Sequence, residues 1–146
     1  MFEFALIFVG LVPRFRRKNK NMIVYRTNKI ITRDKVKENP DVLYLFGDNL
    51  LRKGLGGQAK EMRGEPNTLG IVSKKYPSNN KDSFYTDDDF YSWLEVFSAD
   101  IKNLAERINS GQYKAIVIPQ IGVGLADLPN KAPRIWKYLK TTLDSL

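Results

Sequence analysis

Two glycine-rich stretches of the sequence have the composition of phosphate-binding loops. The first contains Asp48, Asn49, Gly54, Gly56, Gly57 and Gln58, and the second contains Gln120, Ile121, Gly122, Val123, Gly124 and Leu125. Glycines between a strand and a helix let backbone N–H groups approach a phosphate at the positive end of the helix. The first stretch is neither a Walker A loop nor a Gly-x-Gly-x-x-Gly fingerprint. Each stretch alone could be a tight turn, whereas the two together favour a cleft for a diphosphate.

Lys74 and two carboxylates are the candidate reactive side chains. Lys74 ends a strand candidate, where it could be a ligand clamp, a nucleophile or a solvated strand end. Asp48 and Asp127 could share its cleft, as an ion-pair partner or as the base that activates a nucleophile. The three acids at 87–89 could be a cation site, but capping of the helix that follows Thr86 explains them better. We therefore expect no metal site.

The composition excludes several kinds of chemistry. The chain has 146 residues with no cysteine and no histidine, so disulfides, thiolate or imidazole nucleophiles and cysteine- or histidine-based metal sites are ruled out. Lysine and arginine number 24 against 16 aspartate and glutamate, a net charge of +8. Residues 1–21 hold five of the bases and one acid, which leaves +4 for the other 125 residues. That bias favours a phosphorylated ligand but is too small for a surface that wraps DNA.

The elements that must position these residues follow an alternating order. Strands are predicted over 22–26, 42–46, 68–73 and 114–119, and helices over 32–39, 58–63, 86–110 and 131–143. This order predicts an α/β fold with helices on both faces of a mostly parallel sheet. Both glycine-rich stretches directly follow a predicted strand. They therefore meet at the carboxyl edge of the sheet, where ligands of such folds bind.

The first 21 residues differ from the rest. Residues 4–12 are apolar and are followed by Pro13 and the basic run Arg14 to Lys20. Nine apolar residues are too few for a membrane helix, and a secretory signal would carry its charge before the apolar run. An anchor to the inner leaflet is one alternative. We expect instead that residues 1–21 are an upstream extension, that Met22 is the biological start, and that residues 22–146 form a single domain.

Residues from about Met22 to Leu143 resemble a macrodomain, the three-layer α/β/α module that binds ADP-ribose. The resemblance is carried by Val-Leu-Tyr-Leu-Phe-Gly-Asp-Asn at 42–49, Gly-Leu-Gly-Gly-Gln-Ala at 54–59 and Val-Ile-Pro-Gln-Ile-Gly-Val-Gly-Leu at 117–125. Gly-Ile-Val-Ser-Lys-Lys at 70–75 and the Ile-Gly-x-Gly-Leu loop are similar to the terminal ADP-ribose protein glycohydrolase subgroup. Small proteins of this kind also occur in bacteriophages.

The resemblance implies a role for each candidate residue. Gly54, Gly56 and Gly57 would flank the distal ribose and the diphosphate, while Gly122, Val123 and Gly124 would wrap the pyrophosphate. Asn49 falls where macrodomains place an asparagine on the distal ribose. Lys74 falls where the glycohydrolase subgroup has a lysine that attacks C1″ of the ribose, assisted by an acid after the second glycine loop.

Three positions depart from the family pattern. The acid expected directly after Gly-x-Gly-Leu is Ala126, and Asp127 comes one residue later. The position of the catalytic aspartate of other hydrolase macrodomains is Ala59, and Arg26-Thr27-Asn28 replaces the acid that contacts adenine. These departures favour ligand binding over hydrolysis.

We expect a protein that binds ADP-ribose or a derivative and hydrolyses an ADP-ribosyl linkage or an ADP-ribose phosphate ester. Lys74 would be the nucleophile or a ground-state clamp and Asp127 the acid/base. The alternative is a non-catalytic reader or sponge of such a nucleotide, and a weaker alternative is a basic nucleic-acid-binding module. ADP-ribose or a related nucleotide is the expected partner, either alone or attached to protein or nucleic acid. No cofactor is expected, and no membrane partner is expected for residues 22–146. A cytoplasmic monomer is expected, in the host cytoplasm for a phage protein.

Overall fold

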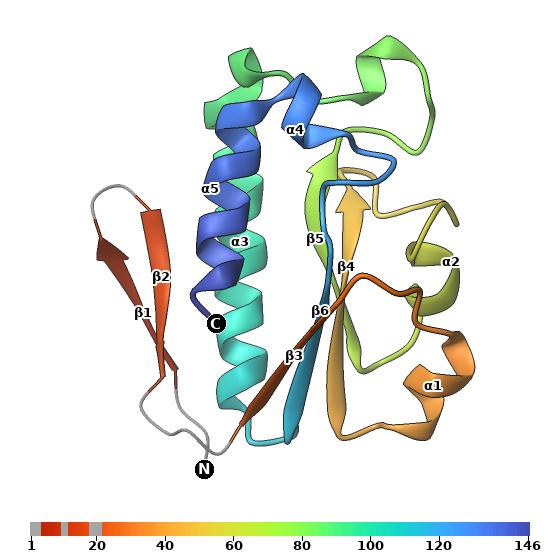
Figure 1. Cartoon of the computed structure of the whole chain (residues 1–146), viewed down its shortest axis with the longest axis vertical. Helices are drawn as coiled ribbons and strands as arrows, with labels where there is room; N and C mark the ends of the chain where they lie inside the picture. Colours follow the sequence, from red (N-terminus) through yellow and green to blue (C-terminus); the bar gives the residue numbers. More distant parts are fainter. Residues whose placement is uncertain (1–3, 10–11, 18–21) are drawn as a thin grey trace.

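The computed structural model describes residues 4–9, 12–17 and 22–146, and four parallel strands form its central sheet. Their order is β3-β6-β4-β5. The strands are β3 (Ile23–Thr27), β4 (Val42–Asn49), β5 (Thr68–Lys74) and β6 (Ala115–Pro119). All four predicted strands are therefore confirmed, and their carboxyl ends lie along one edge of the sheet (Figure 1).

Helices cover both faces of this sheet, which confirms the predicted three-layer α/β architecture (Figure 1). On one face lie α3 (Phe90–Asn109) and α5 (Pro133–Asp144). On the other lie the shorter α1 (Arg33–Glu38) and α2 (Ala59–Met62). Three further short elements are η1 (Lys81–Ser83), η2 (Asp87–Asp89) and α4 (Leu128–Lys131).

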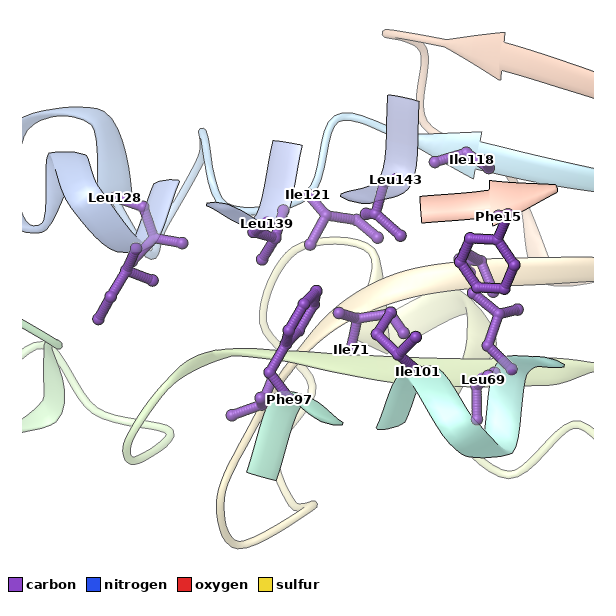
Figure 2. Packing of buried hydrophobic residues seen from close by; sticks show 14 of the residues in the cluster. Phe15, Leu69, Ile71, Phe97, Ile101, Ile118, Ile121, Leu128, Leu139 and Leu143 are labelled. Atoms are coloured by element: carbon purple, nitrogen blue, oxygen red, sulfur yellow. The ribbon is translucent and has the colours of Figure 1, made fainter. Parts of the chain in front are cut away.

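Strand β4 is buried on both faces, as its continuous apolar sequence predicts. Leu43 and Leu45 belong to the larger core under α3 and α5, while Tyr44 and Phe46 belong to the smaller core under α1 and α2. In the larger core, Phe97 and Ile101 of α3 pack with residues of the sheet and of α5 (Figure 2). Alternate side chains of β4 thus pack into the cores on the two faces of the sheet.

The outer edge of β5 is closed by side chains of α3 at seven-residue spacing. Trp93 Nε1 donates to Val72 O at 3.1 Å, and an Asp100 carboxylate oxygen accepts from Val72 N at 2.8 Å. Seven residues further along α3, Arg107 donates to Thr68 O at 2.6 Å. These bonds satisfy backbone groups that an edge strand leaves without a partner strand. Burial against the sheet raises the pKa of Asp100, because removal from water disfavours the charged carboxylate.

The acids at 87–89 do not all cap their own helix. The capping box is present, since Asp89 accepts from Thr86 N at 2.9 Å. The Asp87 carboxylate, however, accepts from the N–H groups of Arg134 and Ile135, at 3.0 and 3.3 Å. It therefore caps α5, a contact between distant segments that corrects the sequence-based explanation.

The last predicted helix, 131–143, is confirmed as α5, and the short helix α4 lies directly before it. Ala132 separates the two helices with φ −147° and ψ 69°, outside the helical region. Its successor is Pro133, whose ring disfavours the helical conformation in the residue before it. As a result α4 directly follows the second glycine loop, and α5 is free to run along the sheet.

Two strands precede the sheet in the chain, β1 (Phe4–Val9) and β2 (Val12–Arg17), and they pair as an antiparallel hairpin. The hairpin lies against α3 and α5 (Figure 1). Phe15 is buried in the larger core, and its N–H donates to Ser145 Oγ at 2.8 Å. Lys18 and Lys20 of the basic run lie outside the described residues. None of the helices described is both long and apolar enough to cross a bilayer.

Candidate functional site

A cleft of about 620 Å³ lies where the four strands end, and we call it the main cleft. Both glycine loops line it, together with the carboxyl ends of β4, β5 and β6. It brings together Lys74 and every residue predicted to bind the ligand: Asp48, Asn49, Gly54, Gly56, Gly57, Gln58, Gln120, Ile121, Gly122, Val123, Gly124 and Leu125. Asp127 does not line it.

A second cavity of about 510 Å³, the side cavity, adjoins the main cleft. The two share Asn28 and residues of the 119–123 segment as a common wall. Trp136, Leu139 and Lys140 of α5 form the other side. The spacing of Trp136 along its helix could not have shown that this side chain borders a cavity. The two cavities therefore lie next to each other along the second glycine loop.

Asp48 is part of a buried ion pair and is not a free base. Its carboxylate accepts from both terminal nitrogens of Arg63, at 2.5 and 3.1 Å, and its side chain is 3% exposed. Gly70 leaves the space for it, because a Cβ there would lie 2.5 Å from Asp48 Oδ2. Arg63 also donates to Gly54 O at 2.9 Å and Lys53 O at 3.2 Å. The ion pair therefore holds the first glycine loop to the sheet.

Asn49 and Gln58 were also predicted to bind the ligand, but their side-chain amides form hydrogen bonds to backbone groups. Asn49 Oδ1 accepts from Leu51 N at 3.0 Å, and its Nδ2 donates to Lys53 O at 2.7 Å. Gln58 bonds both backbone groups of Ile31, at 2.9 and 2.6 Å. Asn49 thus shapes the first glycine loop, and Gln58 ties α2 to the segment after β3. The bonds of Asn49 are local, as in an Asx turn, whereas Ile31 lies 27 residues from Gln58 and no local pattern could have indicated it.

Two glycines of the first loop lie close to other segments of the chain. A Cβ on Gly56 would lie 3.1 Å from Leu125 Cδ1 in the second glycine loop, and one on Gly54 would lie 2.8 Å from Pro77 Cβ in the segment after β5. Gly54 and Gly122 have φ of +92° and +89°, which side-chain-bearing residues rarely adopt. Within the described chain, the backbone N–H groups of Gly56, Gly122 and Val123 have no hydrogen-bond partner. The loops therefore supply unpaired donors to the wall of the main cleft.

Basic side chains predominate in the main cleft. Lys29, Lys53, Arg63 and Lys74 line it, against the single carboxylate of Asp48 that Arg63 neutralises. In the ranges that the structure describes, no three acidic residues gather closely enough to hold a metal ion. The electrostatics of the cleft favour an anionic ligand.

Lys74 lines the main cleft without the carboxylate partner that the sequence suggested. Its Nζ lies 3.4 Å from Asn79 Oδ1 and 4.7 Å from the centre of the Phe84 ring. Burial lowers the pKa of Lys74. Asp127 begins α4 with φ +47°, and it accepts from Asn130 Nδ2 at 2.8 Å. The preceding residue, Ala126, is the one that lines the cleft, so the one-residue displacement of the acid removes it from the site.

We expect Lys74 to lose its proton at a lower pH than an ordinary lysine side chain, since desolvation disfavours the ammonium form. A depressed pKa means that its contribution to stability is present above the ordinary lysine value of 10.5 and is lost as the pH falls through the folded pKa. The measurement is an NMR titration of ¹³C-methylated lysines, with Lys74→Gln assigning the Lys74 signal. Titration of Lys74 at or above the ordinary lysine value of 10.5 would contradict the expectation.

Comparison with known proteins identifies a family for this chain but no activity. A model of a family of unknown function, DUF7831, matches residues 26–142, a range that includes every residue lining the main cleft. No curated protein and no solved structure matches the chain.

Proposed function

The chain belongs to a family of unknown function, DUF7831, and from the site itself we propose that it binds ADP-ribose or a closely related nucleoside diphosphate sugar. The diphosphate would lie between the two glycine loops. The distal ribose would lie toward Lys74, and the base would occupy the side cavity. The observation that carries this proposal is the set of unpaired N–H groups that both loops bring to one basic cleft.

The shape of the site supports a ligand with two ends. The side cavity and the main cleft meet at the second glycine loop, where Ile121 and Val123 line both. A diphosphate bound at this junction would direct one nucleoside or sugar into each cavity. The macrodomain resemblance in the same loops supports ADP-ribose as the first candidate among such ligands.

The surroundings of Lys74 favour binding without turnover, the function of a reader or sponge. A lysine nucleophile needs a group that moves protons beside it. Asp48 is engaged by Arg63, and Asp127 does not line the main cleft. Hydrolysis stays as a second candidate because burial lowers the pKa of Lys74, which increases the fraction of neutral amine at the cleft.

Calorimetric titration of the full chain with ADP-ribose, and with AMP as the control, tests the proposal. We expect ADP-ribose to bind with a micromolar dissociation constant and AMP to bind at least 30-fold more weakly, because AMP lacks the diphosphate and the distal ribose. Absence of binding to ADP-ribose would refute the proposal. Equal binding of both ligands would assign the site to a nucleoside monophosphate instead.

Replacing Lys74 with alanine is expected to weaken ADP-ribose binding by about 10-fold, since one cation is lost from the cleft. A reader would show no turnover of ADP-ribosylated protein or nucleic acid in either form of the protein. A hydrolase acting through Lys74 would show turnover that this substitution abolishes. Turnover that survives in the alanine variant would remove Lys74 from the chemistry.

A further inference from the structure

The two edges of the central sheet differ in how they are covered. At the β5 edge, side chains of α3 bond to backbone groups of the strand, whereas β3 is the last strand on the other side of the sheet. Figure 1 shows β3 in front of β6, and no helix or strand is drawn over it. An uncovered edge strand presents a row of N–H and C=O groups that can pair with another strand.

The pairing of β3 with β6 shows which backbone groups of β3 face outward. Ile23 N donates to Lys114 O at 3.2 Å. Alternate residues of a strand bond to the same neighbour, so Ile23 and Tyr25 bond to β6. Val24 and Arg26 therefore direct their N–H and C=O groups away from the sheet. In the described ranges, these groups make no turn, loop or cap bond.

The sequence of β3 lacks the features that usually protect an edge strand. The strand contains no proline, lysine or bulge, and four of its five residues are β-branched or aromatic. Its one charged side chain, Arg26, lies 3.9 Å from the carboxylate of Asp144 and donates to Leu146 O at 2.9 Å. A second strand at this edge would therefore meet no unpaired charge.

The face of β3 on the side of α1 and α2 is also exposed. Val24 packs against the larger core, so Ile23 and Tyr25 point to the opposite face, where they are 49% and 54% exposed. Neither of these two residues lines the main cleft or the side cavity, so an extended peptide would find no pocket for its side chains. A second β3 instead brings the same exposed side chains, which can cover each other across the two strands.

We propose that β3 pairs with β3 of a second copy of this chain, antiparallel and about a two-fold axis at Tyr25. Val24 then lies opposite Arg26 of the other copy, and each such pair exchanges both of its N–H···O=C bonds. The two Tyr25 rings lie directly opposite each other, and Ile23 lies opposite Thr27. The chain is then a dimer, not the monomer expected from the sequence. Because the strands are antiparallel, the two main clefts lie at opposite ends of the joined sheet.

Sedimentation of the full chain at increasing concentration tests the dimer. One short strand is a small interface, so we expect a weak dimer with a dissociation constant on the order of 100 µM. Tyr25→Lys should weaken it at least about 10-fold, since two ammonium groups then face each other across the axis. Tyr91→Lys is the matched control, because it replaces an exposed tyrosine of α3, and it should leave the dissociation constant unchanged. A monomer at every concentration up to about 500 µM, or equal constants for the two variants, would overturn the proposal.

A mixture of two variants tests the two-fold axis. Tyr25→Lys and Tyr25→Glu should each be largely monomeric, whereas an equal mixture should dimerise at least as tightly as the unsubstituted chain, because opposite charges then face each other. A defect in folding would not be restored by mixing, so a mixture that stays monomeric would overturn the pairing at Tyr25.

Amide exchange locates the new hydrogen bonds. In concentrated protein, exchange of the Val24 and Arg26 N–H groups should slow several-fold relative to dilute protein, while the Tyr25 N–H should change little because it bonds to β6 in both states. Unchanged exchange at Val24 and Arg26 would also contradict the proposal. Since the main clefts lie away from the axis, Tyr25→Lys should bind ADP-ribose as the unsubstituted chain does, so failure of the dimer and failure of the proposed function are separate results.

Discussion

Replacing Arg63 with alanine is expected to lower the free energy of unfolding by about 3 kcal/mol, because the buried carboxylate of Asp48 loses its main partner. Arg63 makes two bonds to Asp48 and two more to the carbonyls of Lys53 and Gly54. Arg52 lies 3.8 Å from Asp48 and remains in the variant. The expected loss of unfolding free energy is therefore at the lower end of the range for a broken buried ion pair. Urea unfolding of the full chain measures it.

Lys60→Ala is the matched control, since Lys60 is an exposed cation on α2, the short helix that Arg63 directly follows. It should change the free energy of unfolding by no more than about 0.5 kcal/mol. Asp48→Asn combined with Arg63→Ala should cost less than the sum of the two single changes, because both remove the same interaction. Additive effects would mean that the ion pair does not hold the loop as we describe.

Replacing Gly56 with valine is expected to weaken ADP-ribose binding by at least 30-fold while leaving the unfolding midpoint nearly unchanged. Gly56 is exposed and its φ is not in the left-handed region, so a side chain is compatible with the fold. Its Cβ would lie 3.1 Å from Leu125 Cδ1, in the narrow space between the two glycine loops. Calorimetric titration gives the affinity, and urea unfolding gives the stability.

Gly56→Ala provides a graded comparison, because it adds one methyl group at the same point. Its effect on affinity should be several-fold and clearly smaller than that of valine, if the space between the loops holds the diphosphate. Full affinity in the valine variant would place the ligand elsewhere. A large loss of stability in either variant would instead show that Gly56 serves the fold.

The larger elements of the fold are predictable because they rest on local patterns. The run of apolar residues from Val42 to Phe46 requires burial on both faces, and the three- and four-residue spacing in α3 requires one buried face. The short helix α4 was not predicted, although Pro133, which marks the start of α5, is present in the sequence. The capping of α5 by Asp87 had no such signal, since its partners lie 47 and 48 residues away.

By itself, the sequence determined that two glycine loops and Lys74 meet at one edge of an α/β sheet. The physical reason is that parallel strands joined by helices bring their carboxyl ends together wherever the loops are long enough to connect them. Only the tertiary structure decided what each polar side chain does there. Asp48 bonds to Arg63 and Gln58 to Ile31, because a side chain takes the partner that three-dimensional packing presents. These side-chain partners decide whether a cleft is suited to binding or equipped for catalysis.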